Sequence, residues 1–205
     1  MTKKMAQLKF NELAPDFDVQ TVTGEIIRLS SLWNGKTLIL AFTRHFGCPQ
    51  CKKMLSELVE YNPELINAGF SIAVITQGTP TETAKFCIKY APGILCLADS
   101  NRQAYKAFGL PKGTLSQTLL SRRVWKANAR VKKEKGWKPE MAPQGQDVMQ
   151  MSGVFIIGSD GRIRLPYYYD DIADHPSMDL LLKGFLGTDW QKPFSSAISP
   201  KKETG

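Results

Sequence analysis

Short apolar runs alternate along this chain with longer segments whose apolar residues recur at helical spacing. Three runs, 37–43, 70–75 and 153–157, are almost continuously apolar, which predicts buried strands. From Lys52 to Asn67 the apolar residues stand three and four positions apart, which predicts a helix. Pro63 interrupts this segment, so we expect the helix to be kinked or split there.

Weaker signals complete the order of elements. Asp16–Thr21 and Glu25–Leu29 flank Thr23-Gly24, which predicts an N-terminal β-hairpin. The other predicted elements are a helical turn at 30–33, helices at 81–90, 101–108 and 177–186, a strand at 94–97, and a strand at 162–165 that forms a hairpin with 153–157. This order predicts an α/β fold in which helices flank a mixed central sheet.

The organisation that we expect is a single domain over residues 10–190. It carries an insertion at about 112–150, and the tail at 191–205 is expected to be flexible because it is rich in small polar residues and proline.

Bulk properties predict where the chain works. Its 205 residues are 42% hydrophobic, which is enough for one core, and no apolar run approaches the ~18 residues of a membrane span. The first residues carry charge without the apolar stretch of a signal peptide. Four cysteines are too few for a disulfide scaffold. We therefore expect a cytoplasmic protein, in which a close cysteine pair is catalytic or metal-binding.

The formal net charge of +8 is concentrated in the insertion. Residues Lys112 to Lys138 hold nine Lys or Arg and one acid, Glu134, and the 18 basic and 18 acidic residues elsewhere cancel. A basic helix with one apolar stripe is predicted here, and the stripe consists of Leu115, Leu119, Leu120, Val124 and Trp125. Such a helix suits a solvated pocket cover, an acidic partner or a membrane surface. Nucleic acid is not expected, because no nucleic-acid motif accompanies the helix.

The candidate chemistry lies in a turn after the first buried strand. Cys48 and Cys51 stand three residues apart, and Pro49 suits the first position of a helix. Cys48 is thus predicted at the helix N-cap, where free N–H groups and the helix dipole favour a thiolate. Cys51 lies one turn further on the same face and can attack an oxidised Cys48. The pair predicts a reversible dithiol–disulfide cycle.

Two neighbours of the pair are candidate substrate-binding or thiolate-stabilising residues. Arg44 can neutralise the Cys48 thiolate or hold a peroxidic or anionic substrate, although a structural ion pair is the alternative. His45 can donate a proton or a hydrogen bond, or it can be a solvated turn residue.

No metal or cofactor is predicted. Zinc needs four ligands, and the remaining candidates, His45, His175, Cys87 and Cys96, lack a matching spacing. The chain has no glycine-rich phosphate loop or dinucleotide fingerprint. Cys87, on a predicted helix, and Cys96, in a predicted strand, are expected to be buried structural thiols. Cys87 is an alternative resolving thiol if it faces the site.

Several motifs resemble the AhpC/TSA redoxins of the peroxiredoxin superfamily. They are Ala14-Pro15-Asp16-Phe17, Thr23-Gly24, Ser30-Ser31-Leu32, the cysteine turn, and Leu97-Ala98-Asp99-Ser100. Arg44 followed by Gly47-Cys48 and Cys51, the run Gly153–Ser159, and an insertion with Trp125 resemble the peroxiredoxin-like 2 branch. The resemblance spans about residues 10–187. It implies a thioredoxin-like fold with the Cys-x-x-Cys pair as redox centre.

The chain departs from that pattern at three positions. Conventional peroxiredoxins have Pro-x-x-x-Thr-x-x-Cys, and here Ala41 and His45 stand at the Pro and Thr positions before Cys48. Ser152 stands where the family has a distant Arg. The thioredoxin signature Trp-Cys-Gly-Pro-Cys is absent, and so is its cis-proline, at Ser152-Gly153.

The resemblance implies a thiol oxidoreductase, a peroxiredoxin-like antioxidant that reduces peroxide and takes electrons from a thioredoxin-like dithiol. Because of the departures, two alternatives stay open. One is a thiol-disulfide or endoperoxide reductase, and the other is a redox-switched binding protein without peroxidase activity.

Overall fold

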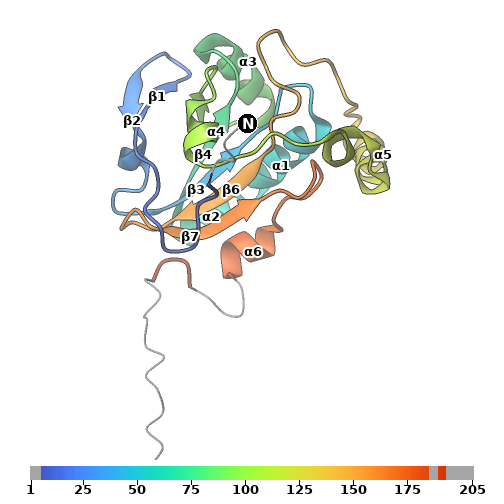
Figure 1. Cartoon of the computed structure of the whole chain (residues 1–205). Coiled ribbons are helices and arrows are strands. Elements are labelled where there is room, and N and C mark those ends of the chain that lie inside the picture. The colour runs from blue at the N-terminus through green and yellow to red at the C-terminus, as the bar shows by residue number, and fades with distance from the viewer. Residues whose placement is uncertain (1–5, 185–188, 193–205) are drawn as a thin grey trace, which may run out of the picture.

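A mixed seven-stranded sheet forms the centre of the molecule in the computed structural model, which describes residues 6–184 and 189–192 (Figure 1). The strands are β1 (Asp18–Thr21), β2 (Ile26–Arg28), β3 (Thr37–Phe42), β4 (Phe70–Thr76), β5 (Leu95–Ala98), β6 (Gly153–Ile157) and β7 (Ile163–Tyr168). Their order is β2-β1-β5-β4-β3-β6-β7, with β3, β4 and β5 parallel and the other neighbours antiparallel. The predicted mixed sheet and both predicted hairpins are confirmed.

Helices cover both faces of the sheet. They are η1 (Leu29–Leu32), α1 (Pro49–Glu60), α2 (Asn62–Asn67), α3 (Pro80–Tyr90), α4 (Gln103–Ala107), the π-turn η2 (Ser116–Leu120), α5 (Arg122–Lys135) and α6 (Met178–Lys183). The predicted break near Pro63 is confirmed, because α1 ends at Glu60 and Pro63 stands in the first turn of α2. The last helix is shorter than predicted and ends at Lys183, before Gly184. Residues 193–205 of the predicted flexible tail lie outside the described residues.

The sheet divides the core in two, as its inner strand β3 shows. All residues of β3 are buried, and successive side chains point to opposite faces. Ile39 and Ala41 pack with side chains of α1, α2, α3 and α6. Leu40 and Phe42 pack on the other face, with η1 and with Tyr105 of α4. The end of β3 is thereby fixed from both sides.

The two edges of the sheet are short or interrupted. The edge strand β2 has three residues. On the other edge, β7 contains Pro166, which has no N–H to donate, and its pairing with β6 shifts register at Ile156/Ile157. Residues 11–14 cover the start of β7, where the Asn11 N–H donates to the Ile163 carbonyl over 2.8 Å.

The insertion leaves and re-enters the fold at one place, since Lys112 and Gln150 form an antiparallel bridge. The predicted single apolar stripe is wrong. Ser121 has an extended backbone with ψ 132° and caps α5, so η2 and α5 do not share one helix axis. Val124 is buried while Leu120 and Trp125 are exposed. Within the described part of the chain, no helix combines the length and the apolar character needed to span a membrane.

Candidate active site

The end of β3 and the start of α1 place both cysteines of the predicted pair. Beyond β3, the Tyr105 hydroxyl donates to the carbonyls of Thr43 (2.7 Å) and Ile75 (3.1 Å), which fixes the ends of β3 and β4. The Cys48 N–H then donates to the His45 carbonyl over 3.1 Å and closes a turn. Cys48 is the N-cap of α1 and Pro49 follows it in the first turn, as predicted.

The two sulfur atoms form one buried unit with Arg44. Cys48 is only 1% exposed, and Arg44 Nη1 lies 3.8 Å from its Sγ. The Cys51 thiol donates to Cys48, and this bond and the Arg44 charge lower the pKa of Cys48 to about 6 against the opposing effect of burial. Burial and the neighbouring Cys48 sulfur raise the pKa of Cys51. Cys48 therefore provides the thiolate, and Cys51 keeps its proton.

Arg44 is held in place by the returning end of the insertion. Its Nε donates to the Gln150 carbonyl over 3.1 Å and its Nη2 to the Val148 carbonyl. Its backbone N–H donates to Cys51 Sγ over 3.2 Å. The buried guanidinium thus has neutral partners as well as the sulfur, so most of its positive charge remains available to the Cys48 thiolate.

His45 lies beside the pair as an uncharged group. Burial lowers its pKa to about 4, and the charges of Arg44 and Lys52 act in the same direction. Its Nδ1 is buried without a hydrogen-bond partner among the described residues, and the side chain lines a cavity. A neutral imidazole carries one donor and one acceptor nitrogen.

Ser152 lies on the other side of the pair. Its Oγ is 3.9 Å from Cys51 Sγ, close to the bond that a Cys48–Cys51 disulfide would form. The described residues contain no cis peptide bond, so Ser152-Gly153 is trans. In this site the positive charge comes from Arg44, four residues before Cys48, rather than from position 152.

A cavity of about 490 Å³ opens in front of Cys48. Arg44, His45 and Cys48 are its polar floor. The remaining wall comes mostly from a loop of the insertion, 139–149, which we call the covering loop, and most of its exposed surface is apolar. Its apolar lining residues are Pro139, Met141, Ala142, Pro143, Val148, Met149 and Ile172, and its polar ones are Thr118, Asn128, Glu140, Gln144 and Gln146. Its shape suits a molecule with an apolar body and one polar reactive group.

The covering loop is fastened to the cysteine turn through the backbone and through side chains. The Glu140 N–H donates to the Gly47 carbonyl over 3.0 Å, and a Cβ at position 47 would collide with the Glu140 carbonyl. Glycine is therefore required there by close approach rather than by φ. Lys52, 1% exposed, forms a salt bridge of 2.9 Å with Glu140 and lies over the Tyr90 ring.

Gln77, at the end of β4, is a second fastening point. Its amide nitrogen donates to the carbonyls of Arg44 (3.0 Å) and Asp147 (3.2 Å), and its oxygen accepts from the Asp147 N–H over 2.8 Å. Sequence reasoning missed Gln77 and Glu140, because neither residue belongs to a spacing pattern. Phe46-Gly47 next to the pair was the available signal for a close backbone approach.

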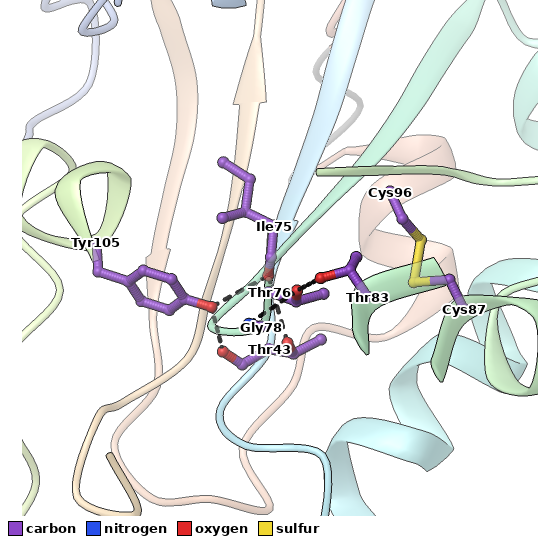
Figure 2. The surroundings of a disulfide bond; sticks show 8 residues. All are labelled: Thr43, Ile75, Thr76, Gly78, Thr83, Cys87, Cys96 and Tyr105. Carbon is purple, nitrogen blue, oxygen red and sulfur yellow. Dashed lines mark hydrogen bonds between the residues drawn. A yellow bond between two sulfur atoms is a disulfide. The ribbon is translucent and has the colours of Figure 1, made fainter. Parts of the chain in front are cut away.

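The other two cysteines form a disulfide between α3 and β5, with a separation of nine residues between Cys87 and Cys96 (Figure 2). This corrects two expectations, buried thiols at both positions and Cys87 as an alternative resolving thiol, because neither sulfur carries a free thiol here. Thr83 of α3 lies between this disulfide and the end of β4, where its hydroxyl bonds that of Thr76 over 2.7 Å. The free cysteines are Cys48 and Cys51.

Comparisons with known proteins identify the family and the fold. The AhpC/TSA family matches residues 10–165. A prostamide/prostaglandin F synthase from Salmo salar is 26% identical over 189 residues, covering 87% of this chain and 88% of that protein. A peroxiredoxin-like 2C from Mus musculus is 22% identical over 174 residues, covering 82% and 76%. Among solved structures, peroxidoxin BcpB from Mycobacterium tuberculosis superimposes with a TM-score of 0.56 at 20% identity, covering 77% and 83%. The fold is therefore thioredoxin-like.

Proposed function

Since this chain belongs to the AhpC/TSA family and is a thiol-dependent oxidoreductase, we propose that it reduces peroxide bonds by cycling Cys48 and Cys51 between dithiol and disulfide. The observation that carries this proposal is the Cys48 thiolate, with a pKa of about 6, at the floor of an apolar cavity and in contact with the Cys51 thiol. Arg44 and His45 are the proposed supporting residues.

In the first step, the Cys48 thiolate attacks one oxygen of a hydroperoxide. A sulfur–oxygen bond forms, the oxygen–oxygen bond breaks, and the alkoxide leaves as an alcohol after taking a proton from solvent. Cys48 becomes a sulfenic acid. Arg44 holds the thiolate in position for this attack.

In the second step, Cys51 attacks the Cys48 sulfur. The sulfur–sulfur bond forms, the sulfur–oxygen bond breaks, and the hydroxide leaves as water with the proton of the Cys51 thiol. An endoperoxide would follow the same course, because the two sulfur attacks would release its two oxygens as two hydroxyl groups. A thioredoxin-like dithiol then reduces the disulfide, in line with the reductants of the family in general.

The cavity favours organic peroxides over hydrogen peroxide. Its wall is mostly apolar, and an organic substrate gains about 0.8 kcal/mol for each CH₂ group that it buries. The Salmo salar relative is named a prostamide/prostaglandin F synthase, a name that is compatible with an organic substrate here. A protein disulfide is a less suitable oxidant, because Cys48 is 1% exposed and the covering loop would have to move. The dithiol donor that reduces the Cys48–Cys51 disulfide requires the same movement of the covering loop.

The test follows oxidation of the reduced protein by equimolar hydrogen peroxide or cumene hydroperoxide, with rapid quenching and intact mass to detect the Cys48–Cys51 disulfide. Free cysteine at matched thiolate concentration is the reference. We expect both peroxides to react orders of magnitude faster than with free cysteine, and kcat/KM to be at least about tenfold higher for cumene hydroperoxide. Oxidation at the free-thiolate rate would exclude peroxidase activity.

A pair of matched variants tests the cavity. Val148→Thr keeps the side-chain shape and makes the wall polar, so the ratio of kcat/KM for cumene hydroperoxide to that for hydrogen peroxide should fall several-fold. Val22→Thr makes the same change outside the cavity and should leave the ratio unchanged.

In Cys51→Ser, a Cys48 sulfenic acid should accumulate and react with dimedone. Rapid turnover by that variant would remove Cys51 from the cycle.

A further inference from the structure

Gln146 of the covering loop has one end of its side-chain amide bound and the other end without a partner. Its Oε1 accepts a hydrogen bond from the Phe46 N–H over 2.9 Å, and a backbone N–H can only donate. The orientation of the amide is therefore fixed, with the nitrogen at the other end. Gln146 Nε2 is buried and has no hydrogen-bond partner among the described residues.

A buried donor without an acceptor is uncommon in a folded protein, because it loses its bonds to water and gains nothing in return. The described part of the chain has four buried side-chain polar atoms without a partner, and two of them, His45 Nδ1 and Gln146 Nε2, belong to residues that line the cavity in front of Cys48. A ring nitrogen of a neutral imidazole can be an acceptor, whereas an amide nitrogen only donates. Gln146 therefore needs an acceptor, and the cavity is the space in which one can bind.

The amide lies at the cysteine turn. Phe46 stands two residues before Cys48, and the oxygen and nitrogen of one amide share a single carbon, so Gln146 Nε2 is close to the Phe46 nitrogen. Cys48 and Gln146 line the same cavity, one from the turn and the other from the covering loop. Both the sulfur and the amide nitrogen are buried. A molecule that reaches Cys48 through this cavity therefore also comes near Gln146.

The residues on either side of Gln146 hold it in place. The Gly145 carbonyl accepts from Arg102 Nη1 over 2.9 Å. The Asp147 N–H donates to the Gln77 side chain over 2.8 Å, and the Asp147 carbonyl accepts from it over 3.2 Å. The amide is thus positioned before a substrate arrives, and fixed donors of this kind stabilise a charge that develops during a reaction.

The proposed peroxide reduction creates such a charge on the leaving oxygen. When the oxygen–oxygen bond breaks, its electron pair stays on the leaving oxygen, which is an alkoxide until solvent protonates it. The nearest donors are already in use. The Cys48 N–H donates to the His45 carbonyl. Arg44 donates through Nε to the Gln150 carbonyl, through Nη2 to the Val148 carbonyl and through Nη1 to the Cys48 sulfur.

We propose that Gln146 is a catalytic residue whose Nε2 donates a hydrogen bond to the leaving oxygen of the peroxide. This role rests on the function proposed above. The Cys48 thiolate attacks the hydroxyl oxygen of the hydroperoxide, the sulfur–oxygen bond forms, and the oxygen–oxygen bond breaks toward the alkoxide. An alkoxide accepts a hydrogen bond more strongly than a neutral peroxide oxygen, so the contact favours the transition state over the bound substrate.

This role also defines which class of peroxide depends on Gln146. An alkyl hydroperoxide releases an alkoxide, which is a strongly basic anion with its charge on one oxygen. A peracid releases a carboxylate, which spreads the same charge over two oxygens and needs little stabilisation. The Gln146 amide therefore serves the reduction of alkyl hydroperoxides and contributes little to the reduction of peracids.

The test follows oxidation of Cys48 by tert-butyl hydroperoxide and by peracetic acid in rapid-mixing experiments with the reduced full-length protein at pH 8. Gln146→Glu keeps an oxygen for the Phe46 N–H and removes the donor, but it adds a charge. Gln146→Met adds no charge, but it gives up the bond to Phe46. Alkylation of Cys48 by iodoacetamide releases no oxygen anion, so its rate corrects each variant for a changed thiolate.

We expect the corrected rate with tert-butyl hydroperoxide to fall at least about tenfold in both Gln146 variants, and the corrected rate with peracetic acid to stay within about twofold of wild type. Gln117→Glu is the matched control. The Gln117 Oε1 also accepts a backbone N–H over 2.9 Å, from Thr114, and Gln117 belongs to the insertion without lining the cavity. Its corrected rates should equal those of wild type.

The outcomes separate failure of this role from failure of the proposed function. Equal falls with both peroxides, no fall with either, a fall confined to Gln146→Glu, or an equal fall in Gln117→Glu would each reject the role of Gln146 and leave the peroxidase function intact. Oxidation of the wild-type protein by both peroxides only at the rate of free cysteine would reject the proposed function, and the role of Gln146 with it.

Discussion

The two cysteine pairs of this molecule are both buried, yet one is reduced and positioned for reaction while the other is a closed disulfide. Cys48 and Cys51 lie at the start of α1, beside a guanidinium and in front of a cavity. Cys87 and Cys96 join α3 to β5, and the hollow next to them is lined mainly by alanine and by larger apolar residues. Burial is common to both pairs, so it does not explain their difference.

What separates the pairs is the charge that surrounds the sulfur. Burial alone raises a thiol pKa and makes it inert. At Cys48 this effect is overcome by the Cys51 hydrogen bond and by Arg44, and a cavity opens in front of the sulfur. No cation among the described residues lines the hollow at Cys87 and Cys96. We therefore expect chemistry at the first pair and mechanical support from the second.

The largest expected effect comes from removing the two pairs in turn. Cys48→Ser should lower peroxide turnover at least about 10³-fold, because serine is not ionised at pH 7 and cannot accept the peroxide oxygen. The double variant Cys87→Ser with Cys96→Ser should remain within about twofold of wild type at 25 °C. Steady-state turnover with a dithiol donor measures both. A double variant as inactive as Cys48→Ser would remove the functional distinction between the pairs.

The second effect is on the free energy of unfolding. Here the Cys87–Cys96 pair should matter more than the Cys48–Cys51 pair. Closing a loop over the nine-residue separation stabilises a folded chain by about 2–3 kcal/mol, mainly by restricting the unfolded state. The same double serine variant should lose about this much free energy of unfolding in urea, whereas Cys51→Ser should lose less. The serines also prevent mispairing with Cys48. An unchanged midpoint and slope for the double variant would contradict a supporting role.

A third, smaller effect concerns the positive charge beside Cys48. Without that charge, the surroundings of the first pair should resemble those of the second. Arg44→Met removes the cation beside Cys48, so the pKa of Cys48 should rise from about 6 by about 1–2 units, and its alkylation rate at pH 7 should fall about two- to tenfold. The pH profile of alkylation measures both.

Arg102→Met is the control for loss of an arginine that holds the covering loop. Arg102 donates to the Gly145 carbonyl over 2.9 Å, as Arg44 does to Val148 and Gln150, and it has no hydrogen bond to either sulfur. Its alkylation profile should match wild type. A shift of equal size in both variants would attribute the low pKa to the loop rather than to the charge.

The remaining effect concerns pH, to which a disulfide does not respond. Because burial holds the pKa of His45 at about 4, below its ordinary 6.5, the unfolded chain binds a proton that the native chain does not. The free energy of unfolding should therefore decrease as pH falls from about 6.5 to about 4. In His45→Gln this decrease should be smaller. The reference protein and the His45→Gln variant are both compared with His175→Gln as a common background. This is needed because burial lowers the pKa of His175 too. Identical slopes would contradict the neutral state of His45.

Local patterns predicted much of the fold and the centre of the site. Continuous apolar runs identified β3 and β4, Pro63 marked the break between α1 and α2, and Pro49 placed Cys48 at the N-cap. These features depend on residues that are adjacent or one helical turn apart, which is the range over which spacing carries information.

The remainder depends on contacts between distant segments. Arg44 is oriented by carbonyls more than a hundred residues away, and no side-chain pattern marks a backbone oxygen. The disulfide requires α3 and β5 to approach across a short turn, which the positions of Cys87 and Cys96 alone do not reveal. The prediction of one apolar stripe in the insertion was wrong for a local reason. Ser121 caps a new helix, α5, whereas the prediction assumed one continuous helix.

The short and interrupted sheet edges have a consequence for the behaviour of the protein in concentrated solution. Strand β2 offers three residues, and β7 offers a proline, a register shift and a start that residues 11–14 already occupy. Neither edge is a template on which a second copy could add strands, so main-chain polymerisation and amyloid-like growth are disfavoured from the native state. Any self-association must instead use side-chain surfaces, and the repulsion of the positively charged insertions opposes that as well.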